Sequence, residues 1–306
     1  MSETPIVFLI FNRPELTARV FAAIREARPR TLLVVSDGPR PTHPEDAAKV
    51  AATRAVIDQV DWPCTVLKDY AAANLGCMVR VSSGLTWAFQ LVEEAIILED
   101  DCLPHPSFFR FCSNLLDYYR NDPRVMHISG DNFQNGIRRT PYSYYFSKIP
   151  HIWGWATWRR AWQMYAVDFP GLAEFLDSNG FASYCPNPGE REYWTNLFRD
   201  TAARQHTWDS QWVFTLWQHN AVAVLPEMNL ISNIGFGPEA THTLGSNAPE
   251  ANIPVADIGE ICHPSAIVRC IEADDFTFQN VFQRKRPRQP VRPWALLRRI
   301  KNSILK

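Results

Sequence analysis

The chain has 306 residues, of which 46% are hydrophobic and 21% are charged, and its formal net charge at pH 7 is −1. This composition supports a packed core and argues against a disordered chain. The near-zero total conceals a contrast, because residues 284–306 carry nine Lys or Arg and no acid, which leaves 22 basic against 32 acidic side chains in the rest of the chain. A body this acidic argues against a nucleic-acid-binding protein.

Seven cysteines are scattered along the chain without a C-x-x-C pair. An odd, scattered set is typical of free thiols in a reducing compartment. The first apolar run ends at Asn12-Arg13-Pro14, no charged segment precedes it, and no apolar run approaches the length of a membrane span. The sequence therefore predicts a cytoplasmic protein without a signal peptide.

Apolar runs of strand length alternate with amphipathic stretches in the first half of the chain. This pattern predicts strands at 5–11, 31–36, 65–67, 95–98 and 125–129, and helices at 14–28, 45–60, 78–93 and 108–119. Such alternation indicates a parallel sheet covered on both faces. The predicted fold class is α/β, with a mostly parallel, Rossmann-like sheet flanked by helices and a basic C-terminal tail.

From Tyr142 onward the character of the sequence changes, and residues 151–165 are rich in Trp. We expect a loop and one helix over 170–206, a helix over 209–219, a strand over 221–225 and a loop over 229–243. No internal repeat is present.

Polar clusters follow three of the predicted strands: Asn12-Arg13, Asp37-Gly38 and Glu99-Asp100-Asp101. Ligands of parallel α/β sheets bind at the carboxyl ends of the strands, so these clusters are candidate binding residues.

The acidic run Glu99-Asp100-Asp101 is the sharpest local signal. Three adjacent acids repel one another unless a cation offsets their charge, and their hard oxygen atoms suit Mg²⁺ or Mn²⁺. The alternative is a solvated loop before the helix that begins near Pro106. The position at the end of a strand favours the site.

The other clusters each have two interpretations. Asp37 suits a ribose hydroxyl or a uracil N–H, although Asp-Gly is also an ordinary turn dipeptide. Asn12 and Arg13 suit a base or a phosphate, although Arg13 fits a surface cation equally well. Asn74 either begins a helix or frames the nucleotide, with Arg80 close to the phosphates.

The order of these motifs resembles the nucleotide-binding half of the GT-A glycosyltransferases. A first strand precedes N-R-P, and S-D-G, N-L-G, a helix and an apolar strand into E-D-D follow in turn. E-D-D stands where the family has D-x-D, so the resemblance implies that Glu99 and Asp100 contact the nucleotide sugar and that Asp101 binds the metal ion.

The second half resembles the family as well. The segment 153–158 (WGWATW) stands at the aromatic acceptor loop, which implies acceptor contacts for Trp153, Trp155 and Trp158. The segment 208–212 (WDSQW) resembles the W-D-D-W stretch of the GlcNAc-transferases that begin N-glycan branching, with Ser-Gln rather than a second Asp after Trp208-Asp209. Asp209 is thereby implied as the catalytic base.

The segment 233–243 (NIGFGPEATHT) resembles the loop whose His completes the metal site in many GT-A enzymes, which implies that His242 is a metal ligand. An exposed loop imidazole is the alternative for His242, and packing in the core is the alternative for the Trp residues.

The chemistry of sugar transfer agrees with these roles. A divalent ion between Asp101 and the pyrophosphate would stabilise the leaving phosphate, and an inverting transfer needs a base near the acceptor hydroxyl. Asp209 begins a helix between two Trp residues, so it suits either a base or a helix N-cap. Asp131, Glu190 and Glu192 are the other candidate bases.

The resemblance covers residues 4–245 and implies a GT-A domain over 1–260, with a nucleotide-binding half (1–135) and an acceptor half (136–260), followed by an extension over 261–306. It implies sugar transfer from a nucleotide-diphosphate sugar, a UDP-sugar, to a glycan or lipid-linked acceptor, with inversion and with Mn²⁺ or Mg²⁺. A retaining transferase and an inert sugar- or partner-binding relic are the alternatives. A dinucleotide-dependent dehydrogenase is disfavoured because no G-x-G-x-x-G follows the first strand.

The basic tail has an apolar stripe. Trp294, Leu297, Ile300 and Ile304 fall on one face of a predicted helix, with basic residues beside them. This is the composition of an interfacial helix on an anionic membrane, here the inner face of the cell membrane. A packing helix or a disordered basic end is the alternative.

Overall fold

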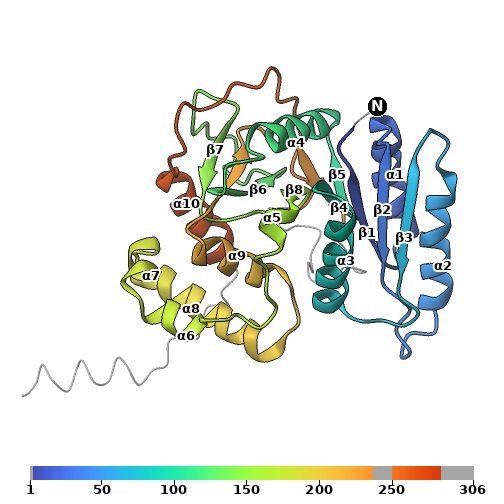
Figure 1. Ribbon diagram of the computed structural model, residues 1–306, viewed down its shortest axis with the longest axis horizontal. Coiled ribbons are helices and arrows are strands. Elements are labelled where there is room, and N and C mark those ends of the chain that lie inside the picture. Colours follow the sequence, from blue (N-terminus) through green and yellow to red (C-terminus); the bar gives the residue numbers. More distant parts are fainter. Residues whose placement is uncertain (1–2, 237–249, 284–306) are drawn as a thin grey trace, which may run out of the picture.

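The computed structural model describes residues 3–236 and 250–283, and an eight-stranded sheet with the strand order β3-β2-β1-β4-β8-β6-β9-β7 runs through it (Figure 1). Strands β1 to β4 pair in parallel, as do β6 and β9, whereas β8 and β7 are antiparallel to their neighbours. Two further short strands pair antiparallel as β10-β5. The strands are β1 (Ile6–Ile10), β2 (Thr31–Ser36), β3 (Thr65–Tyr70), β4 (Glu94–Glu99), β5 (Cys102–Pro104), β6 (Val125–Ser129), β7 (Tyr144–Ser147), β8 (Trp155–Trp158), β9 (Val222–Pro226) and β10 (Ile231–Asn233).

Helices cover both faces of the sheet. They are α1 (Pro14–Ala27), α2 (Asp46–Val56), α3 (Cys77–Leu91), α4 (Pro106–Tyr118), α5 (Arg159–Trp162), α6 (Leu172–Asp177), α7 (Asn179–Tyr184), α8 (Pro188–Arg204), α9 (Asp209–Gln218) and α10 (Ile271–Thr277). A short 3₁₀ turn (Ile57–Gln59) follows α2, and one π turn (Phe278–Phe282) follows α10. The predicted α/β class with a mostly parallel sheet is confirmed.

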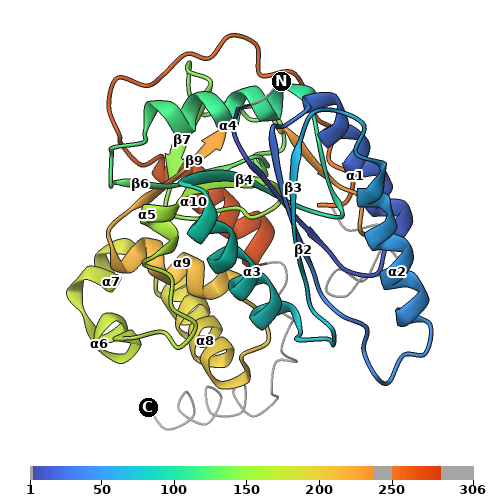
Figure 2. The same cartoon turned by 45° about the vertical axis from the view of Figure 1, so that its right-hand side comes forward.

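Alternating strand residues build two cores on opposite faces of the sheet. On β1, Ile6 and Phe8 pack beneath α1, α2 and α4, while Val7 and Leu9 pack beneath α3 and α9. Figure 2 shows α3 on one side of the first strands and α1 and α2 on the other. Both faces of each of these strands are buried, which explains why the strands are continuous apolar runs in the sequence. At Gly84 a β-carbon would lie 2.3 Å from Val35 Cγ1, so only glycine lets α3 approach β2 this closely.

The second half departs from the sequence-based expectations in several places. Residues 170–206 form three helices (α6, α7 and α8) where one was expected, and β10 lies within the segment predicted as a loop. Strands β7 and β8 were not predicted either, because short antiparallel strands rich in aromatic residues have no pattern of their own. Their pairing with β9 and β4 is what defines them.

The chain returns to the sheet after residue 260. Arg269 bridges to Phe146 of β7, Gln134 Nε2 donates to Thr277 Oγ1 at 2.8 Å, and Ala273 of α10 is buried in the second core. The first part of the predicted extension, up to residue 283, therefore packs against the second half of the fold. The predicted tail helix over 284–306 and the predicted metal ligand His242 lie outside the described residues. Among the described residues, no helix has the length and hydrophobicity needed to cross a membrane.

Candidate functional site

The strand directions bring Arg13 and the acidic run Glu99-Asp100-Asp101 to one edge of the sheet. The carboxyl ends of β1, β2 and β4 are neighbours, with Leu9 opposite Glu99 and Ile10 opposite Ser36. β6 points the same way, because it is antiparallel to β8, which is itself antiparallel to β4. The loops after β1, β2, β4 and β6 therefore share this edge, where α/β sheets bind their ligands.

Arg13 and the three acidic residues meet at this edge. The Arg13 Nη1 atom lies 2.9 Å from Asp101 Oδ2, and Nη2 is hydrogen-bonded to Asp100 Oδ1. Burial acts to lower the pKa of Arg13, but the charges of Asp100 and Asp101 outweigh it and raise that pKa above its ordinary value. Arg13 was predicted as a phosphate or base contact, and in this structure it pairs with the acids.

Backbone contacts fix the positions of these carboxylates. Asp100 accepts a hydrogen bond from Phe11 N at 3.2 Å, and the Asp101 carbonyl accepts one from Ile234 N at 2.8 Å. The residue after Ile234 is Gly235, and a β-carbon there would lie 2.2 Å from Asp101 Oδ2. Glycine is therefore required where the loop after β10 covers the Asp101 carboxylate.

The cluster holds more negative than positive charge. Burial raises the pKa of Glu99 to about 8, and the charges of Asp101 and Asp100 add to this rise, while Arg13 opposes it. Burial also raises the pKa of Asp100 to about 6, although Arg13 acts to lower it. Three carboxylates with one guanidinium are the arrangement in which a bound cation lowers the electrostatic energy.

Asp209 lies within electrostatic range of this cluster. Its negative charge contributes to the raised pKa of Glu99 and to that of Cys77, the first residue of α3. Asp209 Oδ1 accepts hydrogen bonds from Thr207 Oγ1 at 2.6 Å and from Ser210 N at 2.8 Å. Trp208 occupies the N-cap position of α9, with no side-chain capping bond, so Asp209 stands one residue inside the helix.

Asp37 organises the loop that precedes α3. Its Oδ1 accepts from Gly38 N and Leu75 N, and its Oδ2 accepts from Gly76 N and Asn74 Nδ2, at 2.8–3.1 Å. Asn74 Nδ2 also donates to the Gly38 carbonyl. Asp37 and Asn74 were each predicted to contact the nucleotide, and in the structure their side chains are hydrogen-bonded to each other.

Asn12 and Arg80 contact other protein groups at the same edge. Asn12 Nδ2 donates to Asp46 Oδ1 at 2.8 Å, and Arg40 binds the same carboxylate. The Arg40 hydrogen bond is the main cause that lowers the pKa of Asp46. Arg80 is buried and donates to Asp69 Oδ2 at 2.6 Å. Their predicted contacts with a nucleotide remain predictions.

Arg54 is a structural residue of this edge that sequence analysis missed. It reaches from α2 and donates to Ser36 Oγ, to the Asp37 carbonyl and to the Ala71 carbonyl at 2.8–3.0 Å. Its guanidinium also lies over the Tyr70 ring. A single arginine near the end of an amphipathic helix gave no signal, because only the fold brings the ends of β2 and β3 to it.

The predicted acceptor tryptophans separate into two groups. Trp155 and Trp158 are 0% and 2% exposed and lie in the two cores, so neither ring is free to contact an acceptor. This part of the prediction is corrected, because β8 is a central strand whose side chains pack beneath helices on both faces. Trp153 is partly exposed, packs edge-on against Phe133 and Phe236, and remains a predicted acceptor residue.

Glu190, one of the other candidate bases, has a structural role. Glu190 is 2% exposed, and its Oε1 lies 2.6 Å from the ammonium of Lys148. Trp194 Nε1 donates to the same oxygen at 3.3 Å. A buried carboxylate already paired in this way is unsuited to take a proton from a substrate.

The donor set fits a divalent cation that shares its coordination with a substrate. Within residues 3–236 and 250–283, no three Asp, Glu, His or Cys side chains are arranged to hold a metal ion by themselves. Mg²⁺ in nucleotide sites takes one or two carboxylates and completes its shell with phosphates and water. The Asp101 side chain is 12% exposed against 3% for Asp100, so Asp101 is the better placed of the two.

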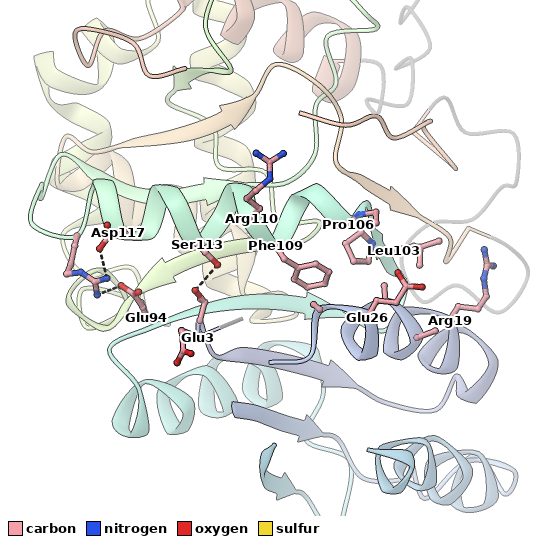
Figure 3. A pocket seen from close by; sticks show the side chains of 16 residues that line it. Glu3, Arg19, Glu26, Glu94, Leu103, Pro106, Phe109, Arg110, Ser113 and Asp117 are labelled. Carbon is pink, nitrogen blue, oxygen red and sulfur yellow. Dashed lines mark hydrogen bonds and ion pairs between the residues drawn. The ribbon is translucent and has the colours of Figure 1, made fainter. Parts of the chain in front are cut away.

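The described structure also contains two clefts. One, of about 890 Å³, runs between α1 and α4 beside Glu94, Leu103 and Phe109 (Figure 3). The other, of about 860 Å³, lies among loops near Asn132 and Glu227. None of the predicted site residues lines either cleft, so we locate the candidate site by its charged groups.

No protein-family model and no curated protein matches the chain. Solved structures give weak likenesses. A 4-diphosphocytidyl-2C-methyl-D-erythritol synthase from Anaerococcus prevotii is 9% identical with a TM-score of 0.34, over 58% of this chain and 86% of that chain. An apo UDP-glucose pyrophosphorylase is 9% identical with a TM-score of 0.38, over 74% and 93% of the two chains. A UDP-glucose pyrophosphorylase complexed with UDP-glucose is 10% identical with a TM-score of 0.27, over 47% and 62%.

Likenesses at these levels assign neither a substrate nor an activity to this chain. Its function has to be argued from the side chains at the carboxyl edge of the sheet.

Proposed function

We propose that the chain is a GT-A-type glycosyltransferase that moves a sugar from a UDP-sugar to the hydroxyl group of a glycan or lipid-linked acceptor. One observation carries the proposal. The acidic residues at the end of β4, which hold an excess of negative charge beside Arg13, lie within electrostatic range of Asp209 on α9. A candidate cation site and a candidate base thus share one edge of the sheet.

The proposal gives each group a separate task. Asp101 would hold Mn²⁺ or Mg²⁺ against the diphosphate, and the bound ion would stabilise the negative charge that develops on the leaving phosphate. The nucleoside would lie over the ends of β1 to β3, where Asp37 and Asn74 shape the loop before α3. Asp209 would take the proton of the acceptor hydroxyl as that oxygen attacks the anomeric carbon.

The charge balance supports this assignment over a purely structural role. One guanidinium, that of Arg13, is shared by Asp100 and Asp101, and burial together with the charges of these two acids raises the pKa of Glu99. A structural ion-pair network would gain nothing from an uncompensated buried acid, whereas a site for a dication and a diphosphate needs one.

A thermal-shift screen of nucleotide sugars with and without Mn²⁺ tests the proposal. We expect a UDP-sugar to raise Tm in a Mn²⁺-dependent manner. Asp101→Asn should abolish that metal-dependent gain and the transferase activity, and Asp58→Asn, an exposed acid bound to Lys68, serves as the matched control. Full activity in excess EDTA, or no stabilisation by any nucleotide sugar, would contradict the proposal.

We also propose that the basic segment 284–306 attaches the protein to anionic membrane surfaces at the cytoplasmic face. Each basic residue near such a surface contributes about 1 kcal/mol at most. Sedimentation with phosphatidylserine vesicles should therefore be lost when 284–306 is deleted. If the full-length chain does not sediment with these vesicles, this attachment is refuted.

A further inference from the structure

A second polar pair lies at the same edge of the sheet, beyond β4. Asp131 follows β6 and His151 precedes β8, and they are 1% and 4% exposed. The His151 Nδ1 atom lies 3.5 Å from Asp131 Oδ2. Asp131 Oδ1 and both imidazole nitrogens are buried without a hydrogen-bond partner. Buried polar groups are normally paired, so these three atoms call for an explanation.

The other buried histidine of this region provides a comparison within the same fold. His127 is 0% exposed, and both its nitrogens are paired. Its Nε2 lies 2.8 Å from the His151 carbonyl, and its Nδ1 accepts from Trp212 Nε1 at 3.0 Å. The buried acid Asp274 is similarly bound by Ser147 and Arg269. The fold therefore satisfies its purely structural histidine and acid, and it leaves the Asp131–His151 pair open.

The backbone holds this pair firmly in place. Gly130 N donates to the Gly154 carbonyl at 2.7 Å, and Asn132 N donates to Asn229 Oδ1 at 3.0 Å, which fixes Asp131 from both sides. His151 N donates to Ser129 Oγ at 3.1 Å. Anchored main chains that carry buried polar atoms without hydrogen bonds are the arrangement of a preorganised binding site.

Phe133 covers the His151 ring, and two further aromatic side chains continue outward from it. Phe133 stacks on the His151 ring, with centroids 4.7 Å apart, Trp153 packs edge-on against Phe133, and Phe236 packs against Trp153. All three residues are partly exposed. Aromatic rings next to a carboxylate and an imidazole offer a sugar both an apolar surface and hydroxyl partners.

We propose that Asp131 and His151 bind hydroxyl groups of the transferred sugar beneath the Phe133, Trp153 and Phe236 rings. This inference rests on the proposed function, because the position of the sugar is inferred from the proposed positions of the nucleoside and the diphosphate of the donor. With the nucleoside over β1 to β3 and the diphosphate at β4, the sugar extends across β8 toward β6.

Binding of UDP and of a UDP-hexose by isothermal titration tests this inference. We expect Asp131→Asn and His151→Gln to weaken binding of the best UDP-hexose by about 10-fold to 100-fold, the scale of one hydrogen bond to a charged group, and to leave UDP binding within about twofold. His263→Gln is the matched histidine control, because His263 bonds to Tyr144 away from this edge. Equal losses for UDP and the UDP-hexose, or no loss for either, would overturn the inference.

A measurement on the unmodified chain covers the case in which the variants do not fold. The ¹⁵N resonance of His151 Nε2 should shift when the UDP-hexose is added and stay in place when UDP is added. If the wild-type chain binds no UDP at all, the proposed function fails. If it binds UDP and UDP-hexose but neither His151 nor the variants respond to the sugar, only this inference fails, and the pair is structural.

Discussion

Arg13 links the loop after β1 to the acidic residues after β4, with its Nη1 atom 2.9 Å from Asp101 Oδ2 and its Nη2 atom bonded to Asp100. The guanidinium occupies one side of the carboxylate that we propose as a metal ligand. Arg13 and a metal ion therefore act on the same negative charge, and the two should be energetically coupled.

Arg13→Met should lower the free energy of unfolding by about 3 kcal/mol, because it leaves Asp100 and Asp101 buried without their partner. Mn²⁺ should restore more stability to this variant than it gives to the wild type. Urea unfolding with and without MnCl₂ measures both effects, with Arg25→Met as the control, since Arg25 pairs with Asp61 at the surface. Equal stabilisation of the two proteins by Mn²⁺ would show that the cluster does not bind the ion.

Asp37→Ala should weaken UDP affinity by about 1.5–3 kcal/mol, the scale of a lost hydrogen bond to a charged group. The structure adds a second expectation. The carboxylate already accepts bonds from Gly38, Asn74, Leu75 and Gly76, so the variant should also lose stability.

Asn74→Ala distinguishes direct contact from loop positioning. It removes one of the bonds to Asp37 and leaves the carboxylate in place. If Asp37 acts through the loop, titration calorimetry should show part of the same affinity loss in Asn74→Ala. Unchanged UDP affinity in both variants would make Asp37 a turn residue only.

Residues whose environment is set by their own strand were predictable from the sequence. The apolar runs of β1, β2 and β4 predicted both the parallel sheet and the edge that Arg13, Asp37 and Asp101 share. Strand direction alone carries this information, because parallel strands place their following residues together.

Residues whose environment is set by distant segments were not predictable. Trp155 and Trp158 were predicted to contact the acceptor sugar, yet β8 lies between β4 and β6 and both rings are buried. His151 gave no signal in the sequence, because its partner Asp131 lies 20 residues away and β6 and β8 have to pair before the two meet.

His127 should make stability depend on pH in the acid range. Burial lowers the pKa of His127 from 6.5 to about 3, so the folded chain keeps this imidazole neutral while the unfolded chain protonates it. Its contribution is therefore present above pH 6.5 and is lost as pH falls toward 3, with a slope of at most about 1.4 kcal/mol per pH unit.

His127→Gln keeps a donor and an acceptor but cannot be protonated in this range. We expect the stability difference between the wild type and this variant to shrink as the pH is lowered from about 7 to about 4, as measured by urea unfolding. His263→Gln, at a partly exposed imidazole, should leave the slope much closer to that of the wild type. Parallel pH profiles for the wild type and His127→Gln would mean that His127 is protonated in the folded chain.

Asp209→Asn should lower kcat by about 10²–10⁴, the usual contribution of a general base, while donor affinity and Tm change little. The amide oxygen can still accept the bonds from Thr207 and Ser210, but it cannot take a proton, and a base is needed far more in the transition state than in the ground state. Asp200→Asn, at an exposed acid of α8 that pairs with Arg204, is the matched control. The measurements are steady-state rates with the acceptor, and calorimetry with UDP in the same buffer.

Because Trp208 rather than Asp209 holds the N-cap position, a loss of capping cannot imitate the result. Near-normal turnover by Asp209→Asn would remove the base assignment and leave Asp131, Glu192 or a retaining transfer as the alternatives, since Glu190 is already paired with Lys148.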